Sequence, residues 1–104
     1  MTTNVFFVIN LATANAAEMA KIDEMAAFLK AHPQAKVTVT GYADAGTGTK
    51  SYNLALSKKR AEYVASKLQA AGVAASQITV DAKGDTVQPF AENDKNRVAI
   101  CVAE

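Results

Sequence analysis

The fold is decided by residues 36–72, which read KVTVTGYADAGTGTKSYNLALSKKRAEYVASKLQAAG. In residues 36–42 valines alternate with threonines, a pattern typical of a β-strand. The segment 46–49, rich in glycine and threonine, breaks regular structure. Ser51 is suited to cap a helix that continues to Ala71, because a glycine follows where a left-handed C-cap residue belongs.

The segments on either side extend this pattern. Residues 5–9, Val-Phe-Phe-Val-Ile, form a short continuous apolar run that predicts a central strand covered on both faces. After Asn15, an N-cap candidate, apolar residues recur every three or four positions and predict a helix that ends near Ala31. Residues 78–80 and 98–102 predict two more strands. The order β-α-β-α-β-β predicts an α/β (α+β) two-layer sandwich, with both helices on one face of a mixed four-stranded sheet.

Length and composition narrow the function classes. The 104 residues suffice for one domain, 1–104. A formal net charge of +1 lacks the basic excess typical of nucleic-acid-binding proteins, so we expect no nucleic-acid partner. The only cysteine, Cys101, and the only histidine, His32, supply neither a disulfide, a zinc site nor a Cys–His nucleophile. We expect Cys101 to be a small core residue, and we expect no metal and no cofactor.

The second predicted helix carries polar residues where its apolar face should continue. In its C-terminal half, the apolar stripe passes through Val64 and Leu68. Extended toward the N-terminus, the same stripe meets Asn53, Ser57 and Arg60, whereas the two lysines before Arg60 lie on the solvated side. An inward arginine needs a partner, because an unpaired buried charge costs several kcal/mol or more.

Asp44 is the nearest candidate partner of Arg60. It lies just beyond the end of the strand 36–42, where open α/β sheets place their ligand sites. Two interpretations stay open. In the first, Asp44 and Arg60 form an internal salt bridge that fixes the loop. In the second, both face a cleft, where the arginine binds a carboxylate and the aspartate binds an ammonium of a zwitterionic amino-acid head group.

The same residues carry a family resemblance. The chain contains G-Y-A-D at residues 41–44, N-x-x-L-S-x-x-R-A at residues 53–61 and a terminal strand that begins N-R-V at residues 96–98. This order closely resembles that of the OmpA-like peptidoglycan-binding domain and covers nearly the whole chain. The resemblance implies that residues 1–104 are a single OmpA-like domain of a longer envelope protein, whose membrane anchor lies outside this sequence.

The resemblance also implies a function. Domains of this family are periplasmic and non-enzymatic; they bind the diaminopimelate residue of the peptidoglycan stem peptide and tether an outer-membrane or envelope protein to the cell wall. Carried over by position, Asp44 would bind the ammonium of diaminopimelate and Arg60 its carboxylate. Asn53 would order the loop or line the site, and Ser57 would lie beside it.

Two departures from the family pattern concern the same site. The loop from Asp44 to Asn53 is one residue longer than the commonest form, which affects how its backbone donors are presented. Where relatives commonly carry paired arginines before the last strand, this chain has Asn96 and Arg97. Arg97 is therefore a further ligand-binding candidate, ranked below Arg60.

Two other function classes remain alternatives. One is a protein-interaction or structural domain of the same fold, in which the Asp44–Arg60 salt bridge is internal and no wall ligand binds. The other is an enzyme, which would need a nucleophile and a base that one carboxylate beside one arginine does not supply. The aspartates at positions 81, 85 and 94 flank turns, where capping explains them without metal binding.

Overall fold

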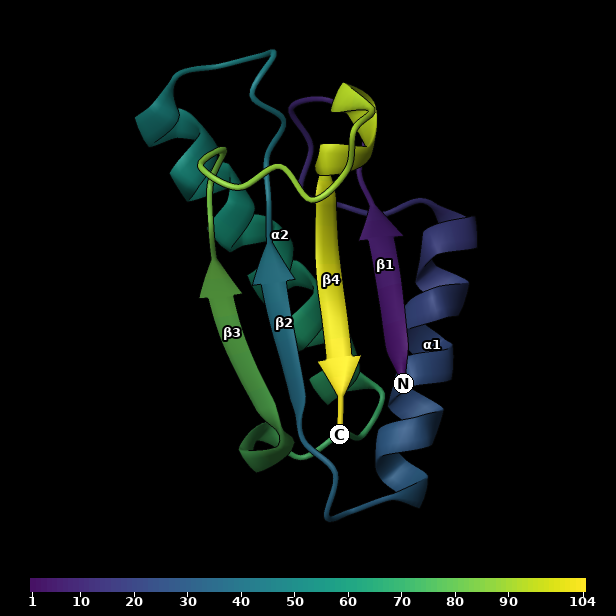
Figure 1. Cartoon of the computed structure of the whole chain (residues 1–104). Coiled ribbons are helices and arrows are strands. Elements are labelled where there is room, and N and C mark those ends of the chain that lie inside the picture. Colours follow the sequence, from purple (N-terminus) through teal and green to yellow (C-terminus); the bar gives the residue numbers. More distant parts are fainter.

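A mixed four-stranded sheet forms one layer of the protein, and the computed structural model describes it together with every other residue, 1–104 (Figure 1). The strands are β1 (Thr2–Phe6), β2 (Val37–Gly41), β3 (Ile78–Ala82) and β4 (Val98–Ala103), in the spatial order β1-β4-β2-β3. β4 is antiparallel to both β1 and β2, whereas β2 and β3 are parallel. The predicted two-layer α+β sandwich is confirmed.

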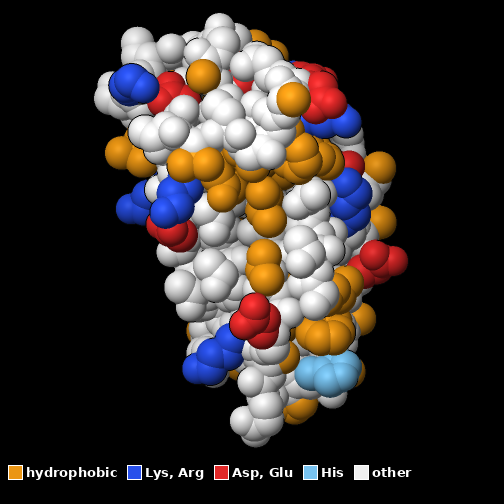
Figure 2. Space-filling view, viewed as in Figure 1, with side chains coloured by type: hydrophobic (Ala, Val, Ile, Leu, Met, Phe, Trp, Pro, Cys, Tyr) orange, Lys and Arg blue, Asp and Glu red, His pale blue; other side chains and the backbone are white.

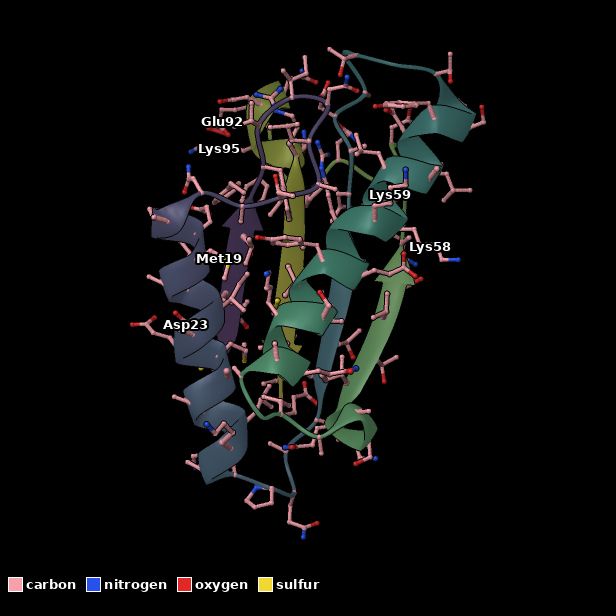
Figure 3. The ribbon with its side chains drawn as sticks, turned by 180° about the vertical axis from the view of Figure 1, so that it is seen from behind. Met19, Asp23, Lys58, Lys59, Glu92 and Lys95 are labelled. Carbon is pink, nitrogen blue, oxygen red and sulfur yellow. The ribbon has the colours of Figure 1, made fainter.

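The helices α1 (Ala16–Ala31) and α2 (Lys50–Ala70) lie side by side on one face of the sheet (Figure 3). The core lies between these two layers, and Cys101 belongs to it as expected. Figure 3 shows Lys58 and Lys59 pointing away from the sheet, and both are exposed, as the helical projection predicts. Neither helix has the length and apolarity that crossing a membrane requires.

The first strand differs from the prediction. β1 covers Thr2–Phe6 rather than residues 5–9, and it is an edge strand that pairs only with β4. Beyond it, the Phe7 amide still donates to the Arg97 carbonyl oxygen at 2.7 Å, and the chain then turns away through Asn10, whose φ is 65°. The prediction was wrong because the second half of the apolar run leaves the sheet. Val8 is exposed and belongs to a loop instead of a strand.

The free edge of β1 is covered by side chains of α1. Glu18 Oε1 accepts a hydrogen bond from the Phe6 amide at 2.7 Å, and Lys21 Nζ donates to the Asn4 carbonyl oxygen at 3.0 Å. Glu18 and Lys21 also form an ion pair at 2.9 Å. Because unpaired edge groups are a template for strand addition, this pair protects the edge against association with another chain.

The N-cap of α1 lies where the sequence predicts it, whereas the N-cap of α2 is displaced. Asn15 caps α1 by accepting from the Glu18 amide at 3.1 Å, as predicted. α2 begins two residues earlier than expected, because Thr49 rather than Ser51 is its N-cap and accepts from the Tyr52 amide at 3.2 Å. The two extra residues shorten the loop that enters the helix, and this loop forms part of the site described below.

Gly41, the last residue of β2, sets the distance between the sheet and α2. A Cβ atom at this position would lie 1.8 Å from the Ser57 carbonyl oxygen. The backbone of β2 therefore approaches the backbone of α2 as closely as only glycine permits. This contact holds the segment after Gly41 against the first half of α2.

Candidate functional site

Three connections meet at the carboxyl end of β2, at the upper end of the molecule in Figure 1. They are the loops 7–15, 42–49 and 83–97. Between the first two and the start of α2 lies a pocket of about 320 Å³. Its lining residues are Ile9, Asn10, Asp44, Thr47, Gly48, Tyr52, Asn53 and Leu56.

Asp44 places a nearly buried carboxylate in the wall of this pocket, with 3% of the residue exposed. Its Oδ1 accepts hydrogen bonds from Thr47 Oγ1 at 2.8 Å and Asn93 Nδ2 at 3.1 Å, and its Oδ2 is 3.4 Å from Arg97 Nη1. Burial by itself would raise the pKa of the Asp44 carboxyl, but these hydrogen bonds outweigh it and hold the pKa below its ordinary range. The group is therefore an anion at neutral pH.

Asn53 and Ser57, which sequence reasoning placed on the inner face of α2, are both buried. Asn53 lines the pocket and donates through Nδ2 to the Thr47 carbonyl oxygen at 2.8 Å and to Asp85 Oδ2 at 2.9 Å. Ser57 lies outside the pocket; its Oγ accepts from the Gly84 amide at 2.9 Å. Asn53 thus orders the loop 42–49, while Ser57 fastens the start of the connection 83–97 to α2.

Arg60 is fully covered, with 0% of the residue exposed, and it does not line the pocket. Its three nitrogens donate to backbone carbonyl oxygens: Nε to Leu11 at 2.9 Å, Nη1 to Tyr42 at 3.0 Å and Nη2 to Val8 at 3.4 Å. Burial lowers the pKa of the guanidinium to about 10, against the opposing effect of the Asp44 charge, so Arg60 remains a cation at neutral pH.

No ion pair joins Asp44 to Arg60; the arginine bound to Asp44 is Arg97. Arg97 Nε also donates to the Phe7 carbonyl oxygen at 3.3 Å, and 19% of its side chain is exposed. A second pocket, of about 370 Å³, lies beside this arginine. Its lining residues are Phe6, Phe7, Val8, Asp94, Lys95 and Arg97.

The connection 83–97 supplies polar residues that sequence reasoning missed. Gln88 bridges the loop 42–49, since its Nε2 donates to the Ala43 carbonyl oxygen at 2.9 Å and its Oε1 accepts from the Ala45 amide at 3.0 Å. Asn93 Oδ1 accepts from the Gly46 amide at 3.1 Å. Their partners lie more than 40 positions away in the sequence, and an irregular connection has no periodicity that would reveal them.

Apolar side chains support the same end of the sheet from its uncovered face, where Figure 2 shows them gathered near the upper loops. The rings of Phe6 and Phe90 lie 5.7 Å apart. Asn96, where the family resemblance leads us to expect an arginine, is buried and exchanges two hydrogen bonds with the Phe90 backbone at 2.8 and 2.9 Å. Asn96 therefore fixes the connection instead of contributing a charge to the pocket.

These features define an α+β domain with a pocket at the end of β2, whose wall contains the anionic Asp44, and Asp44 is paired with the partly exposed Arg97 outside the pocket lining. No group of three or more histidine, cysteine, aspartate or glutamate side chains is placed to hold a metal ion. Residues 6–100 match the OmpA family, and the chain belongs to it.

Curated relatives and solved structures agree with this membership. The chain is 38% identical over 99 residues to Outer membrane protein 40 of Porphyromonas gingivalis, covering 95% of this chain and 26% of the relative. It is 43% identical over 72 residues to the peptidoglycan-binding protein ArfA of Mycobacterium tuberculosis, covering 69% and 22% respectively. The crystal structure of the peptidoglycan-associated lipoprotein of Burkholderia pseudomallei superimposes with a TM-score of 0.91 at 30% identity, covering 97% of this chain and 89% of that one.

Proposed function

We propose that this domain binds peptidoglycan non-covalently through the diaminopimelate residue of the stem peptide. The observation that carries the proposal is the anionic Asp44, nearly buried in a pocket wall and paired with the partly exposed Arg97. Membership of the OmpA family and the similarity to proteins described as peptidoglycan-binding or peptidoglycan-associated support the wall as the partner.

The pocket suits a zwitterionic head group on an aliphatic chain. The ligand ammonium would bind Asp44, whose Oδ2 makes only the long contact to Arg97 and therefore retains acceptor capacity. Ile9 and Leu56, the aliphatic residues of the lining, would pack against the methylene groups that join the two head groups of diaminopimelate. Asn53 keeps the loop 42–49 closed around the ligand through its hydrogen bond to Thr47.

The binding we propose is structural rather than enzymatic. The pocket lining holds one carboxylate, and neither a histidine nor a cysteine that could serve as base or nucleophile. The chain spans about a quarter of Outer membrane protein 40, so the remainder of such a protein would supply the membrane anchor. Its task would be to fasten an outer-membrane or envelope protein to the cell wall from the periplasmic side.

Sedimentation with purified sacculi tests this function. We expect the parent domain to sediment with diaminopimelate-type sacculi, and Asp44→Asn to remain in the supernatant because a neutral amide no longer attracts the ammonium. Asp81→Asn is the matched control, since it removes an exposed carboxylate that pairs with Lys83 outside the pocket. Equal sedimentation of parent and Asp44→Asn would refute the proposed site, and failure of the parent to sediment would refute the function.

A further inference from the structure

A second cavity has its own set of lining side chains. We call it the Arg97 pocket; its lining residues are Phe6, Phe7, Val8, Asp94, Lys95 and Arg97. It has a volume of about 370 Å³ and shares no lining residue with the pocket that contains Asp44. Ligand pockets usually measure about 300–1,000 Å³, so a cavity of this size is suited to a small molecule or to the end of a chain.

Positive charge prevails in the lining of the Arg97 pocket. The lining contains two cations, Lys95 and Arg97, and one carboxylate, that of Asp94. Lys95 Nζ has a single ionic contact, to Glu92 Oε1 at 3.9 Å, and more than half of each side chain is exposed (Figure 3). Such an exposed pair contributes little free energy, so the Lys95 ammonium is available to another anion.

Arg97 also has donor capacity to spare. It makes two hydrogen bonds, from Nη1 to Asp44 Oδ2 at 3.4 Å and from Nε to the Phe7 carbonyl oxygen at 3.3 Å. Hydrogen bonds from nitrogen to oxygen are ordinarily about 2.7–3.2 Å long, so both bonds are weak. A guanidinium has five N–H donors, and those of Arg97 Nη2 bind no protein group. Because 19% of the side chain is exposed, a ligand can reach them.

Phe6 and Val8 give the same pocket an apolar wall. Val8 is 55% exposed, and the Phe6 ring is partly buried beside Phe90 on the uncovered face of the sheet. Neither side chain belongs to the hydrophobic core, which Phe7 joins. Covering apolar surface that is still in contact with water is favourable. The pocket therefore combines free cationic donors with apolar surface that the fold leaves uncovered.

We propose that the Arg97 pocket binds a small hydrophobic organic acid, whose carboxylate binds Arg97 and Lys95 and whose apolar body packs against Phe6 and Val8. An arginine and a carboxylate match in charge and in geometry, since the guanidinium can donate two parallel hydrogen bonds. An inorganic anion would leave the apolar wall uncovered, and an apolar cation would be repelled. The site is separate from the proposed wall-ligand pocket and does not depend on binding of peptidoglycan.

Asp44 competes with such an acid for Arg97. It lines the other pocket, yet its Oδ2 is the one carboxylate oxygen paired with the Arg97 guanidinium. Asp44→Asn removes this charge, so it should strengthen binding of an acid at Arg97. The proposed wall ligand should respond in the opposite direction, because its ammonium needs the Asp44 charge. The two sites are therefore distinguished by the sign of the effect of one substitution.

Titration with phenylacetate, followed by NMR, tests the site. We expect a dissociation constant of about 1 mM, with shifts of the Phe6 and Val8 signals. Phenylacetamide keeps the ring but is neutral, and it should bind about tenfold more weakly because a charge-assisted hydrogen bond is lost. N-acetylglycylphenylalanine presents the same ring and a carboxylate as the end of a peptide. The tighter of the two acids identifies the source of the ligand, a free acid or a peptide carboxyl terminus.

Substitutions in the lining should change the affinity for phenylacetate in both directions. Arg97→Gln should weaken binding by about tenfold or more, and Lys95→Gln by about threefold. Asp94→Asn and Asp44→Asn should each strengthen it by about two- to fivefold, because each removes a competing negative charge. Lys58→Gln is the matched control: it removes an exposed lysine on the outer face of α2 and should leave binding unchanged (Figure 3).

Four results would overturn the proposal. They are a parent that does not bind phenylacetate, equal binding of phenylacetamide, shifts confined to the lining of the Asp44 pocket, and an affinity unchanged in both Arg97→Gln and Lys95→Gln. If Arg97→Gln does not fold, the Lys95→Gln and Asp94→Asn proteins decide. A parent that fails to sediment with sacculi would refute the wall-binding function and leave this site untouched, and failure to bind phenylacetate would leave that function untouched.

Discussion

Replacement of Gly41 by alanine tests the contact that sets the geometry of the site. The added Cβ would lie 1.8 Å from the Ser57 carbonyl oxygen and 2.8 Å from its carbonyl carbon, whereas real Cβ atoms do not approach closer than 3.0 Å. β2 and α2 must therefore separate by more than about 1 Å, and neither backbone atom can rotate away. Overpacking of this kind costs about 1–3 kcal/mol, and we expect the upper end, about 3 kcal/mol.

The sign of the stability change in Gly41→Ala distinguishes a steric clash in the folded protein from the restriction that alanine places on the unfolded chain. Gly41 does not have a positive φ, so without a clash alanine would stabilise the protein by about 0.4–1 kcal/mol by restricting the unfolded chain. We expect the opposite: a thermal midpoint lower by roughly 10–20 °C, followed by circular dichroism. Thr38→Ala, on the exposed face of β2, should change stability by less than about 0.5 kcal/mol. A Gly41→Ala protein as stable as the parent would refute the close approach of β2 to α2.

Three further predictions concern single side chains. Because the folded pKa of Asp44 is depressed, its contribution to stability is present above about pH 4 and is lost as pH falls through the folded pKa, so Asp44→Asn should flatten the acid limb of a stability–pH curve. Burial raises the pKa of the Cys101 thiol to about 12, so a thiol reagent should label it only after unfolding; labelling of the native protein at the same rate would contradict its burial. Glu18→Ala should cost about 1 kcal/mol and accelerate exchange of the Phe6 amide, and unchanged exchange would show that the edge bond is not formed in solution.

The order of elements could be predicted because each helix and strand carries its own periodicity. The position of β1 could not, because periodicity does not specify which strands are neighbours. A run of five apolar residues fits a central strand, and it fits equally well an edge strand whose last residues continue into a pocket wall. Val5 is buried in the core while Val8 is exposed, yet the two are the same residue type. The difference depends on the turn at Asn10, which only the folded chain shows.

The inward direction of Arg60 could be predicted from the helical projection, but its partners could not. They are carbonyl oxygens at sequence separations of 18, 49 and 52 residues. Every residue carries a carbonyl group, so no side-chain pattern marks these positions. A buried guanidinium favours the expectation of a charged partner, and Asp44 is the nearest candidate in the sequence pattern, but neutral acceptors can also satisfy the group.

This choice of partners has a consequence for recognition. If Arg60 were bound directly to Asp44, the carboxylate would be neutralised from inside the protein and would have less acceptor capacity for a ligand ammonium. Because Arg60 uses its donors on carbonyl oxygens, it contributes a positive charge near Asp44 without occupying its oxygens. The carboxylate stays ionised through its bonds to Thr47 and Asn93, and Oδ2 faces only the long contact to Arg97. Under the proposed function, neutral acceptors for Arg60 are therefore better suited to ligand binding than an Asp44–Arg60 salt bridge would be, because they leave Asp44 Oδ2 with only its long contact to Arg97.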